Sequence, residues 1–272
     1  MLGAIIGDIV GSVYEFNNIK TKDFPLFSNE SLYTDDTVMT LAIAEILQKG
    51  YINDKDKIID TIKKWGKTYP NAGYGGRFYF WVLGSDRLPY NSYGNGSAMR
   101  VSACGWYGNS EEEVIDYATK VTEVTHNHPE GIKGAVVTAL SIYYARIGKS
   151  KEFLKEYMEK EYPEIKNLDY EELKRTYEHE EESCQKTLPQ ALYCFLISNS
   201  FEDCIRTTIS IGGDCDTTAA ISCAIAEAYY KKGISKQMLN EVIDRLPFEK
   251  NDCDPITIIK NYLNLKKELK KK

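Results

Sequence analysis

The amino-acid sequence predicts an all-α protein, and three observations support this prediction. Apolar residues recur at helical spacing, regular apolar–polar alternation is scarce, and several segments carry residues typical of helix ends. Hydrophobic residues make up 43% of the 272 residues, enough for a large core. No repeat, low-complexity run or composition break marks a linker, so we expect a single domain spanning residues 1–272.

The chain begins with a predicted helix at residues 3–16. Three glycines at four-residue spacing share one face of it: Gly3, Gly7 and Gly11. Such a stripe allows a second backbone to approach closely. Asp8 and Glu15 are seven residues apart, so we also expect them near one another on a face of this helix.

Further helices are expected wherever helical periodicity returns. They cover residues 36–48, 53–67, 111–124, 130–147, 188–198, 201–209, 217–231 and 235–245. Gly50 is suited to ending the first of these, and Pro129 to the first turn of the helix at 130–147. Residues 151–182, rich in Glu, Lys and Tyr, predict short amphipathic helices. Glycines, asparagines and prolines argue against one continuous element across residues 69–100.

Charge and cysteine content exclude several classes of protein. The formal net charge of −6 does not indicate a general nucleic-acid or anionic-membrane surface, and the terminal KKELKKK is typical of a solvated helix end. No segment is apolar for long enough to span a membrane. The apolar N-terminus lacks a basic region and is interrupted by Asp8, unlike a signal peptide. Seven cysteines without a CxxC pair indicate reduced, buried thiols in a cytoplasmic protein.

Two acidic clusters stand at the starts of apolar helices. Asp214 and Asp216 precede one, and Thr34, Asp35 and Asp36 precede another. Helix capping is the ordinary explanation, because Asp and Thr are good N-caps and acids favour a helix N-terminus. One cap needs only one acceptor, however, and ionised carboxylates beside a core helix need a compensating charge.

A bound cation could supply that charge, because neither cluster has a lysine or arginine beside it in sequence. The candidate ligands are carboxylate and hydroxyl oxygens, which suit Mg²⁺, Mn²⁺ or Ca²⁺ rather than zinc or copper. Cys215, between the two aspartates, is expected to point away. Two clusters permit two divalent cations a few ångströms apart.

Other candidate residues carry weaker signals. Glu15 alone is typical of a surface glutamate at a helix end. The stretch SYGNGSAMR (residues 92–100) predicts a flexible loop with exposed backbone N–H groups, apt for a phosphate or sugar, although Met99 breaks the dinucleotide fingerprint. His126 and His128 favour a polar loop near a site rather than a zinc site, which needs more His or Cys partners.

Five stretches in a fixed order resemble the ADP-ribosylglycohydrolase family: GAIIGDIVGSVYEF, YTDDTVMT, YGNGSAMR, THNHPEGIKGA and GGDCDTTAA. The family includes the dinitrogenase-reductase-activating glycohydrolase and the ADP-ribosylserine and ADP-ribosylarginine hydrolases. The resemblance covers nearly the whole chain. It implies a compact orthogonal multi-helix bundle with two Mg²⁺ or Mn²⁺ ions in a central cleft.

The resemblance also implies roles for individual residues. Thr34, Asp35 and Asp36 would hold one ion, and Asp214, Asp216 and Thr217 the other, with Asp216 bridging. Glu15 would gate the site or aid proton transfer, which makes Glu15, Asp35 and Asp216 the candidate catalytic residues. The implied substrate-binding residues are Tyr93, Gly94, Asn95, Gly96, Ser97, Met99 and His126.

The implied activity is metal-dependent release of ADP-ribose from a protein side chain or a small conjugate. Arginine-directed members carry an additional aspartate in a DIGN-like setting. The corresponding region here lacks that motif and has Asp86 as its only acid, which favours Glu15-centred chemistry. Two alternatives remain: a metal-dependent nucleotide phosphoester hydrolase, and a non-catalytic ADP-ribose-binding or structural relative.

Overall fold

The computed structural model describes residues 1–178 and 182–271, and these fold into α-helices with two short 3₁₀-helices and no β-strand. The all-α prediction is therefore confirmed. The first half contains α1 (Leu2–Gly11), α2 (Asp35–Gln48), η1 (Tyr51–Asn53), α3 (Lys55–Thr68), α4 (Gly76–Leu83), α5 (Gly96–Met99), α6 (Ser102–Tyr107) and α7 (Glu111–Glu123). The second half contains α8 (Pro129–Arg146), α9 (Lys151–Glu161), η2 (Pro163–Asn167), α10 (Tyr170–Thr176), α11 (Cys184–Ile197), α12 (Phe201–Ser210), α13 (Cys215–Tyr230), α14 (Lys236–Arg245) and α15 (Pro255–Leu269).

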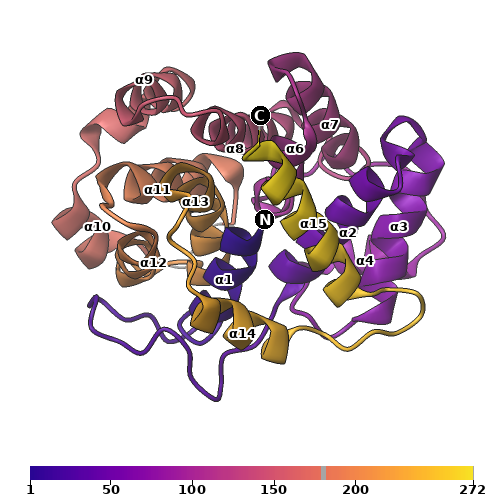
Figure 1. The fold of residues 1–272 in the computed structure, drawn as a ribbon, viewed down its shortest axis with the longest axis horizontal. Helices are drawn as coiled ribbons and strands as arrows, with labels where there is room; N and C mark the ends of the chain where they lie inside the picture. Colours follow the sequence, from indigo (N-terminus) through magenta and orange to yellow (C-terminus); the bar gives the residue numbers. More distant parts are fainter. Residues whose placement is uncertain (179–181, 272) are drawn as a thin grey trace.

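Helices α1 and α13 lie together in the middle of the molecule, with the other helices around them (Figure 1). All ten residues of α1 are buried, as are the residues of α13 from Cys215 to Ala228. The glycine stripe of α1 faces α13 directly. A β-carbon on Gly7 would lie 2.3 Å from the carbonyl oxygen of Ala219, and one on Gly11 would lie 2.5 Å from the α-carbon of Asp216. The predicted close approach of a second backbone is confirmed, and it brings the start of α13 against the end of α1.

A buried glutamate joins α1 and α13 to the C-terminal helix at the opposite end. The carboxylate of Glu227 accepts hydrogen bonds from the Met1 amino group (2.8 Å), the Tyr262 hydroxyl (2.7 Å) and Lys266 Nζ (2.6 Å). Burial acts to raise its pKa, but the amino group and Lys266 outweigh burial and hold the pKa below its usual range. Helix α15, which runs across the front of the molecule in Figure 1, is thus tied to the central pair.

Several predicted helix boundaries need correction. The helix predicted at residues 3–16 ends at Gly11, and Glu15 lies in the turn that follows. Helices α4 and α6 arise in the segments dominated by glycine and aromatic residues, where local propensity gave no helical signal. Tertiary packing holds α4, since Phe78 and Trp81 are buried on one side of it. The predicted roles of Gly50, with φ of 68°, and of Pro129 at the start of α8 are confirmed.

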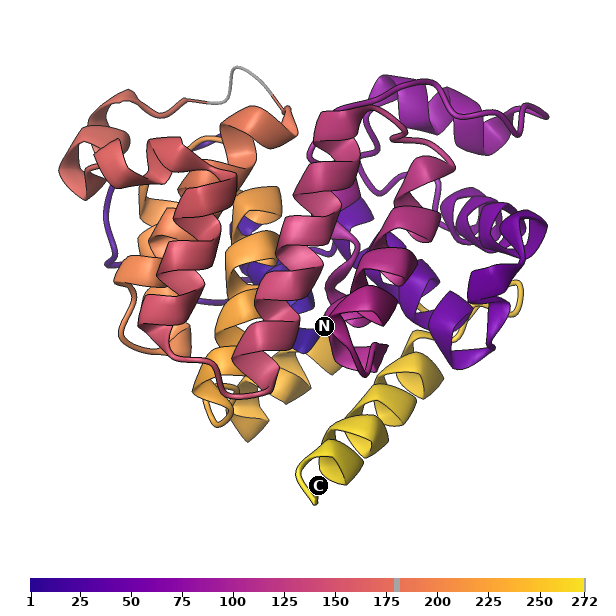
Figure 2. The same ribbon diagram turned by 90° about the horizontal axis from the view of Figure 1, so that it is seen from above.

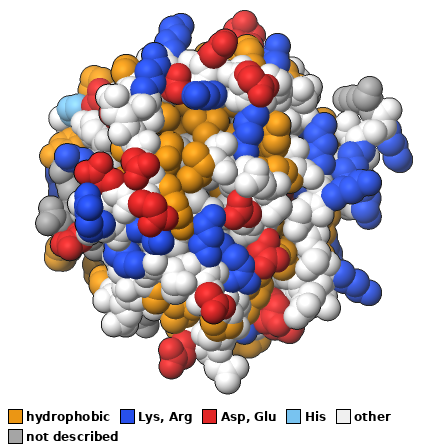
Figure 3. All heavy atoms as spheres, turned by 90° about the vertical axis from the view of Figure 1, so that its left-hand side faces the viewer, with side chains coloured by type: hydrophobic (Ala, Val, Ile, Leu, Met, Phe, Trp, Pro, Cys, Tyr) orange, Lys and Arg blue, Asp and Glu red, His pale blue; other side chains and the backbone are white. Residues whose placement is uncertain are grey.

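The surface agrees with the composition. All seven cysteines are buried and unpaired, as predicted. None of the helices in the described part of the chain combines the length and apolar character that crossing a bilayer requires. Seen from above, α15 projects from the body of the molecule (Figure 2). The face over α9, α10 and α12 carries interspersed acidic and basic side chains around an apolar stretch (Figure 3).

Candidate active site

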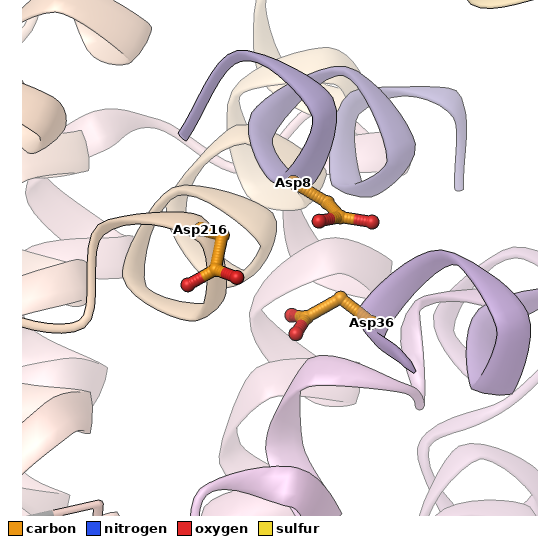
Figure 4. A group of neighbouring side chains, drawn as sticks. All are labelled: Asp8, Asp36 and Asp216. Carbon is orange, nitrogen blue, oxygen red and sulfur yellow. The ribbon is translucent and has the colours of Figure 1, made fainter. Parts of the chain in front are cut away.

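Three aspartates from three different helices meet at the centre of the fold. Asp8 of α1, Asp36 of α2 and Asp216 of α13 are all buried, and each offers a carboxylate oxygen within 4.8 Å of the others. Figure 4 shows the three carboxylates converging from their separate helices. The close contact of α1 with α13 makes this possible, because Asp8 follows Gly7 and Asp216 lies against Gly11.

A second acidic group shares one member with the first. Glu15, Asp214 and Asp216 also offer oxygens within 4.8 Å of one another. Glu15 reaches this group from the turn after α1, not from the helix face predicted for it. Asp216 belongs to both groups, so the structure brings the two sequence clusters and Glu15 together at one place.

Hydrogen bonds hold Asp8 against the first turn of α2. Its carboxylate accepts from the backbone N–H groups of Thr34 and Thr37, each at 3.0 Å, and from the Thr34 hydroxyl at 2.7 Å. The Thr37 hydroxyl donates to it as well. The negative charge lies at the positive end of the α2 dipole, where it is stabilised. Asp8 therefore fixes the start of the helix that carries Asp35 and Asp36.

Asp8 is the acidic residue that the sequence reasoning left out of the site. In the sequence, Asp8 interrupts an apolar run and is expected near Glu15 on one face of the predicted helix. That interruption was the available signal, because a lone carboxylate inside an otherwise apolar buried helix needs a specific partner.

Among the remaining aspartates, Asp36 has one oxygen without a hydrogen-bond partner. Asp36 accepts a hydrogen bond from the Thr217 hydroxyl (3.0 Å) through Oδ2, while its buried Oδ1 has no partner in the structure. Asp214 accepts from the side-chain amide of Asn95 at 2.6 Å. Asp216 Oδ1 accepts from the backbone N–H of Thr217 at 2.9 Å. An unpartnered carboxylate oxygen in such a site is suited to a cation.

Burial acts strongly on these carboxyl groups. It raises the pKa of Asp8 to about 6, against the opposing effect of the hydrogen bonds from Thr37 and Thr34. Burial and then neighbouring carboxylates raise the pKa values of Asp35, Asp36 and Asp216 well above their usual range. For Asp36 and Asp216 the neighbouring charges are other carboxylates. A divalent cation would reverse this effect and favour the ionised forms.

Several of these acids line a cleft of about 520 Å³. Asp35, Asp214, Asp216, Thr217 and Glu15 line its acidic side. The rest of the lining includes four aromatic and two basic residues that no sequence motif predicted: Phe16, Tyr74, Phe78, Tyr90, Arg77 and Arg100. Some of these residues lie in or beside α4, and the others lie in turns and loops. No sequence motif at these positions indicated that they line a site.

The stretch predicted as a flexible loop is instead an ordered turn leading into α5. Backbone pairing with the segment before α11 holds it, because Asn95 N–H donates to the Glu182 carbonyl (2.7 Å) and Cys184 N–H donates to the Tyr93 carbonyl (2.9 Å). The N–H groups of Gly94 and Ser97 also have partners within the chain. Among the described residues, the backbone N–H of Gly96 alone in this turn, from Gly94 to Met99, is without a protein acceptor.

Not every residue predicted to bind substrate faces the cleft. Gly94, Asn95, Gly96, Met99 and His126 line it. Ser97 is fully buried, and its hydroxyl bonds the Gly94 carbonyl at 3.1 Å. Tyr93 instead packs on the ring of His128, with ring centroids 5.2 Å apart.

A chain of three side chains fixes His126 in the cleft wall. Arg100 donates to the Thr125 hydroxyl at 2.8 Å, and that hydroxyl lies 2.7 Å from His126 Nδ1. Burial, followed by the charges of Arg100 and Arg77, lowers the pKa of His126 well below its usual value, so the ring is neutral. The other ring nitrogen, Nε2, faces the turn, since a β-carbon on Gly96 would lie 3.5 Å from it. His128 caps α8 instead, accepting from Glu130 N–H at 3.1 Å.

Comparison with known proteins relates both the fold and the sequence motifs to one protein family. A sequence-family model described as ADP-ribosylglycohydrolase matches residues 1–264. ADP-ribosylhydrolase ARH3 of Mus musculus is 30% identical, covering 85% of this chain and 82% of its own length. The ADP-ribosyl-[dinitrogen reductase] glycohydrolase of Rhodospirillum rubrum is 24% identical, covering 84% and 83%. A solved structure titled as an ADP-ribosylglycohydrolase-related protein complex superposes with a TM-score of 0.67 at 23% identity, over 98% of this chain and 96% of that one.

Proposed function

Because this chain belongs to the ADP-ribosylglycohydrolase family, we propose that it is a divalent-metal-dependent hydrolase that releases ADP-ribose from a conjugate. The conjugate is an ADP-ribosylated protein side chain or a small molecule. The observation that carries the proposal is the presence of two groups of three acids that share Asp216, in which every aspartate is buried and Glu15 is half-buried.

The donor set fits two divalent cations. It consists of carboxylate and hydroxyl oxygens, which Mg²⁺ and Mn²⁺ prefer, and it contains the unpartnered buried Oδ1 of Asp36. In this proposal Thr34, Asp35 and Asp36 hold one ion, and Asp214, Asp216 and Thr217 hold the other. Ions held there would supply Lewis-acid chemistry, with which ribose hydroxyl groups could be oriented and a water molecule polarised.

The protein groups supply the rest of the chemistry. As the acceptor leaves, positive charge develops on the sugar carbon, and the nearby carboxylates of Asp35 and Asp216 stabilise it. Glu15 lies at the rim of the same acidic group and gives or takes the proton of the leaving group or water.

Recognition of the diphosphate rests on few donors. The free backbone N–H of Gly96 and the His126 ring both face the cleft near the same turn, which supports binding of an anionic oxygen there. Asn95 lines the cleft, and its amide donates to Asp214 and to Thr187. We assign it to holding Asp214 in place.

The acceptor is proposed on one further observation. Asp86 is the single acid in the region where arginine-directed members carry their additional aspartate. Its side chain does not line the cleft. Its carboxylate instead caps the backbone N–H of Leu88 at 2.8 Å, on the exposed surface. This supports chemistry centred on Glu15, as in the serine-directed members.

Release of ADP-ribose from serine-linked and arginine-linked ADP-ribosyl peptides tests the proposal, with Mg²⁺ and with EDTA. We expect Mg²⁺-dependent release, faster from the serine-linked peptide. Asp36→Ala and Asp216→Ala should abolish it while leaving the helical circular dichroism intact, and Asp86→Ala is the matched control. Wild-type rates in Asp36→Ala would remove the metal assignment, and release of AMP or phosphate would indicate a phosphoester hydrolase instead.

Glu15→Ala should lower kcat by about 10²- to 10⁴-fold, the range typical of a general acid or base. The affinity for ADP-ribose, measured by calorimetry, should change much less. An unchanged kcat would show that Glu15 takes no part in proton transfer.

A further inference from the structure

Asn18 connects the two chain segments that carry the second acidic group. It lies three residues after Glu15, and its side chain bonds the residue that immediately precedes Asp214. Its Oδ1 accepts from Gly213 N–H at 2.7 Å, and its Nδ2 donates to the Gly213 carbonyl at 3.0 Å. The same Nδ2 donates to the carbonyls of Tyr14 (2.7 Å) and Glu15 (3.0 Å). One side chain therefore bonds the backbone of Glu15 and that of Gly213.

The chemistry of these partners requires an amide. Gly213 presents both a donor and an acceptor, while Tyr14 and Glu15 present acceptors only. An asparagine carries an acceptor oxygen and an NH₂ donor at matching positions, whereas an aspartate could only accept. The amide orientation is also unambiguous, because the flipped amide would face like groups at all four contacts.

The backbone at Gly212 and Gly213 makes this contact possible. Their φ values are 80° and 73°, the left-handed region that glycine adopts without strain. The turn directs both the N–H and the carbonyl of Gly213 to Asn18 and then enters α13 through Asp214. The position of Asp214 and Asp216 relative to Asn18 is thus set by a rigid turn of two residues.

We propose that Asn18 is a positioning residue that sets the place of Asp214, a proposed ligand of the second ion, relative to Glu15. It bonds the backbone of both segments that carry the second acidic group, and its side chain does not line the cleft. Its loss leaves Asp8, Asp36 and Asp216 in place, because they are held by the contacts of α1 with α2 and α13. The effect on a bound metal rests on the proposed function, whereas the effect on the turn itself does not.

Mn²⁺ binding measured by calorimetry and electron paramagnetic resonance tests the proposal with three variants. Asn18→Asp is isosteric and keeps the bond to Gly213 N–H but removes every donor. Asn18→Ala removes all of the bonds without adding charge. Asn17→Asp is the matched control, since it adds the same charge at the exposed neighbouring residue, whose side chain makes no hydrogen bond within the described residues.

We expect wild type and Asn17→Asp to bind two Mn²⁺ ions. Asn18→Asp and Asn18→Ala should retain one and bind the second about 10- to 100-fold more weakly, as is typical when residues that orient metal ligands are lost. Their kcat for ADP-ribose release should fall with KM unchanged. Wild-type affinity for both ions in both Asn18 variants would overturn the proposal.

Hydrogen exchange in EDTA separates failure of this proposal from failure of the metal assignment. The Gly213 amide should exchange faster in Asn18→Ala than in wild type, because its acceptor is gone. If wild type binds no Mn²⁺, the metal assignment fails, and this exchange rate alone decides on Asn18. Unchanged exchange at Gly213 would overturn the positioning role whatever the metal result.

Discussion

At Asp8, burial and hydrogen bonding act on one carboxyl group in opposite directions. Burial raises its pKa, while four donors from Thr34 and Thr37 stabilise the charged form. The result is a pKa of about 6, within the range where a nearby cation decides the protonation state. The same carboxylate fixes the first turn of α2, so the start of that helix and the charge of the site are linked through one residue.

The hydroxyl of Thr125 decides which nitrogen of His126 carries the proton. Arg100 already donates to this hydroxyl, and its alternative acceptor, the Thr122 carbonyl, is 3.5 Å away. The hydroxyl hydrogen therefore points to His126 Nδ1 at 2.7 Å, which leaves the proton on Nε2, the nitrogen facing the Gly96 turn. We propose that neutral His126 donates from Nε2 to an anionic oxygen of the substrate.

Thr125→Val removes this hydroxyl without changing the side-chain volume greatly. We expect the ¹⁵N shifts of His126 to change from a pure Nε2–H form to a mixture of tautomers. ADP-ribose should bind about tenfold more weakly, equivalent to one hydrogen bond. Thr125→Ser, which keeps the hydroxyl, is the control. Identical ¹⁵N spectra of wild type and Thr125→Val would contradict this assignment.

At the scale of elements, the contact between α1 and α13 assembles the site. Gly3, Gly7 and Gly11 allow the two backbones to meet with no side chain between them. Asp8 and Asp216 are adjacent to these contacts, so a small separation of the helices would move the carboxylates apart. The glycine stripe thus serves packing and the active site together.

Gly7→Ala should destabilise the protein, because the added β-carbon would lie 2.3 Å from the carbonyl oxygen of Ala219 in a neighbouring helix backbone. Overpacking of this kind costs about 1–3 kcal/mol, and we expect a lower Tm in thermal unfolding. Gly75→Ala is the control, since a β-carbon there meets nothing within 4 Å and φ is −55°. An equal Tm for Gly7→Ala and wild type would show that α1 can move away without cost.

At the scale of the whole molecule, the buried carboxyl groups at the centre make the stability of the fold depend on pH and on bound metal. The pKa values of Asp8, Asp35, Asp36 and Asp216 are raised in the folded protein, so the metal-free folded state binds more protons than the unfolded chain. The contribution of these carboxyl groups to stability is therefore fully present below about pH 4, the usual pKa of an aspartate in the unfolded chain, and is lost as the pH rises through about 6 and above.

Calorimetry in EDTA should show a Tm several degrees lower at pH 7.5 than at pH 5. Mg²⁺ or Mn²⁺ at pH 7.5 should restore it, because the ions bind the ionised carboxylates of the folded state only. A Tm that rises from pH 5 to pH 7.5 without metal would contradict the buried, uncompensated cluster.

We also propose that residues 1–272 form one domain, so each calorimetric scan should show a single transition. Two separate transitions would contradict this.

The one-domain proposal follows from the core. A single cluster of buried apolar side chains runs from Met1 through α2, α8 and α13 to Tyr262. Helix α15 packs onto α2 and is tied to α13 through Glu227, although these segments are far apart in sequence. The first and last helices therefore belong to the same folding unit.

The sequence by itself determined the all-α class, most helices, the glycine stripe and the two acid clusters. These depend on local physics: helical periodicity, the glycine spacing and the placement of carboxylates before apolar helices. The sequence alone could identify Asp35, Asp36, Asp214 and Asp216. An ionised carboxylate beside a core helix needs a compensating charge, and this requirement is visible from the local sequence.

Only the tertiary structure decided how these pieces combine. In the structure the first helix ends at Gly11, and α4 and α6 form from segments without a local helical signal. The predicted loop at residues 92–100 is an ordered turn that lines the cleft. The tertiary structure also added Asp8 to the acids and placed Asn18 between Glu15 and Gly213. These features depend on groups brought together from distant parts of the chain, and no local pattern encodes which distant groups will meet.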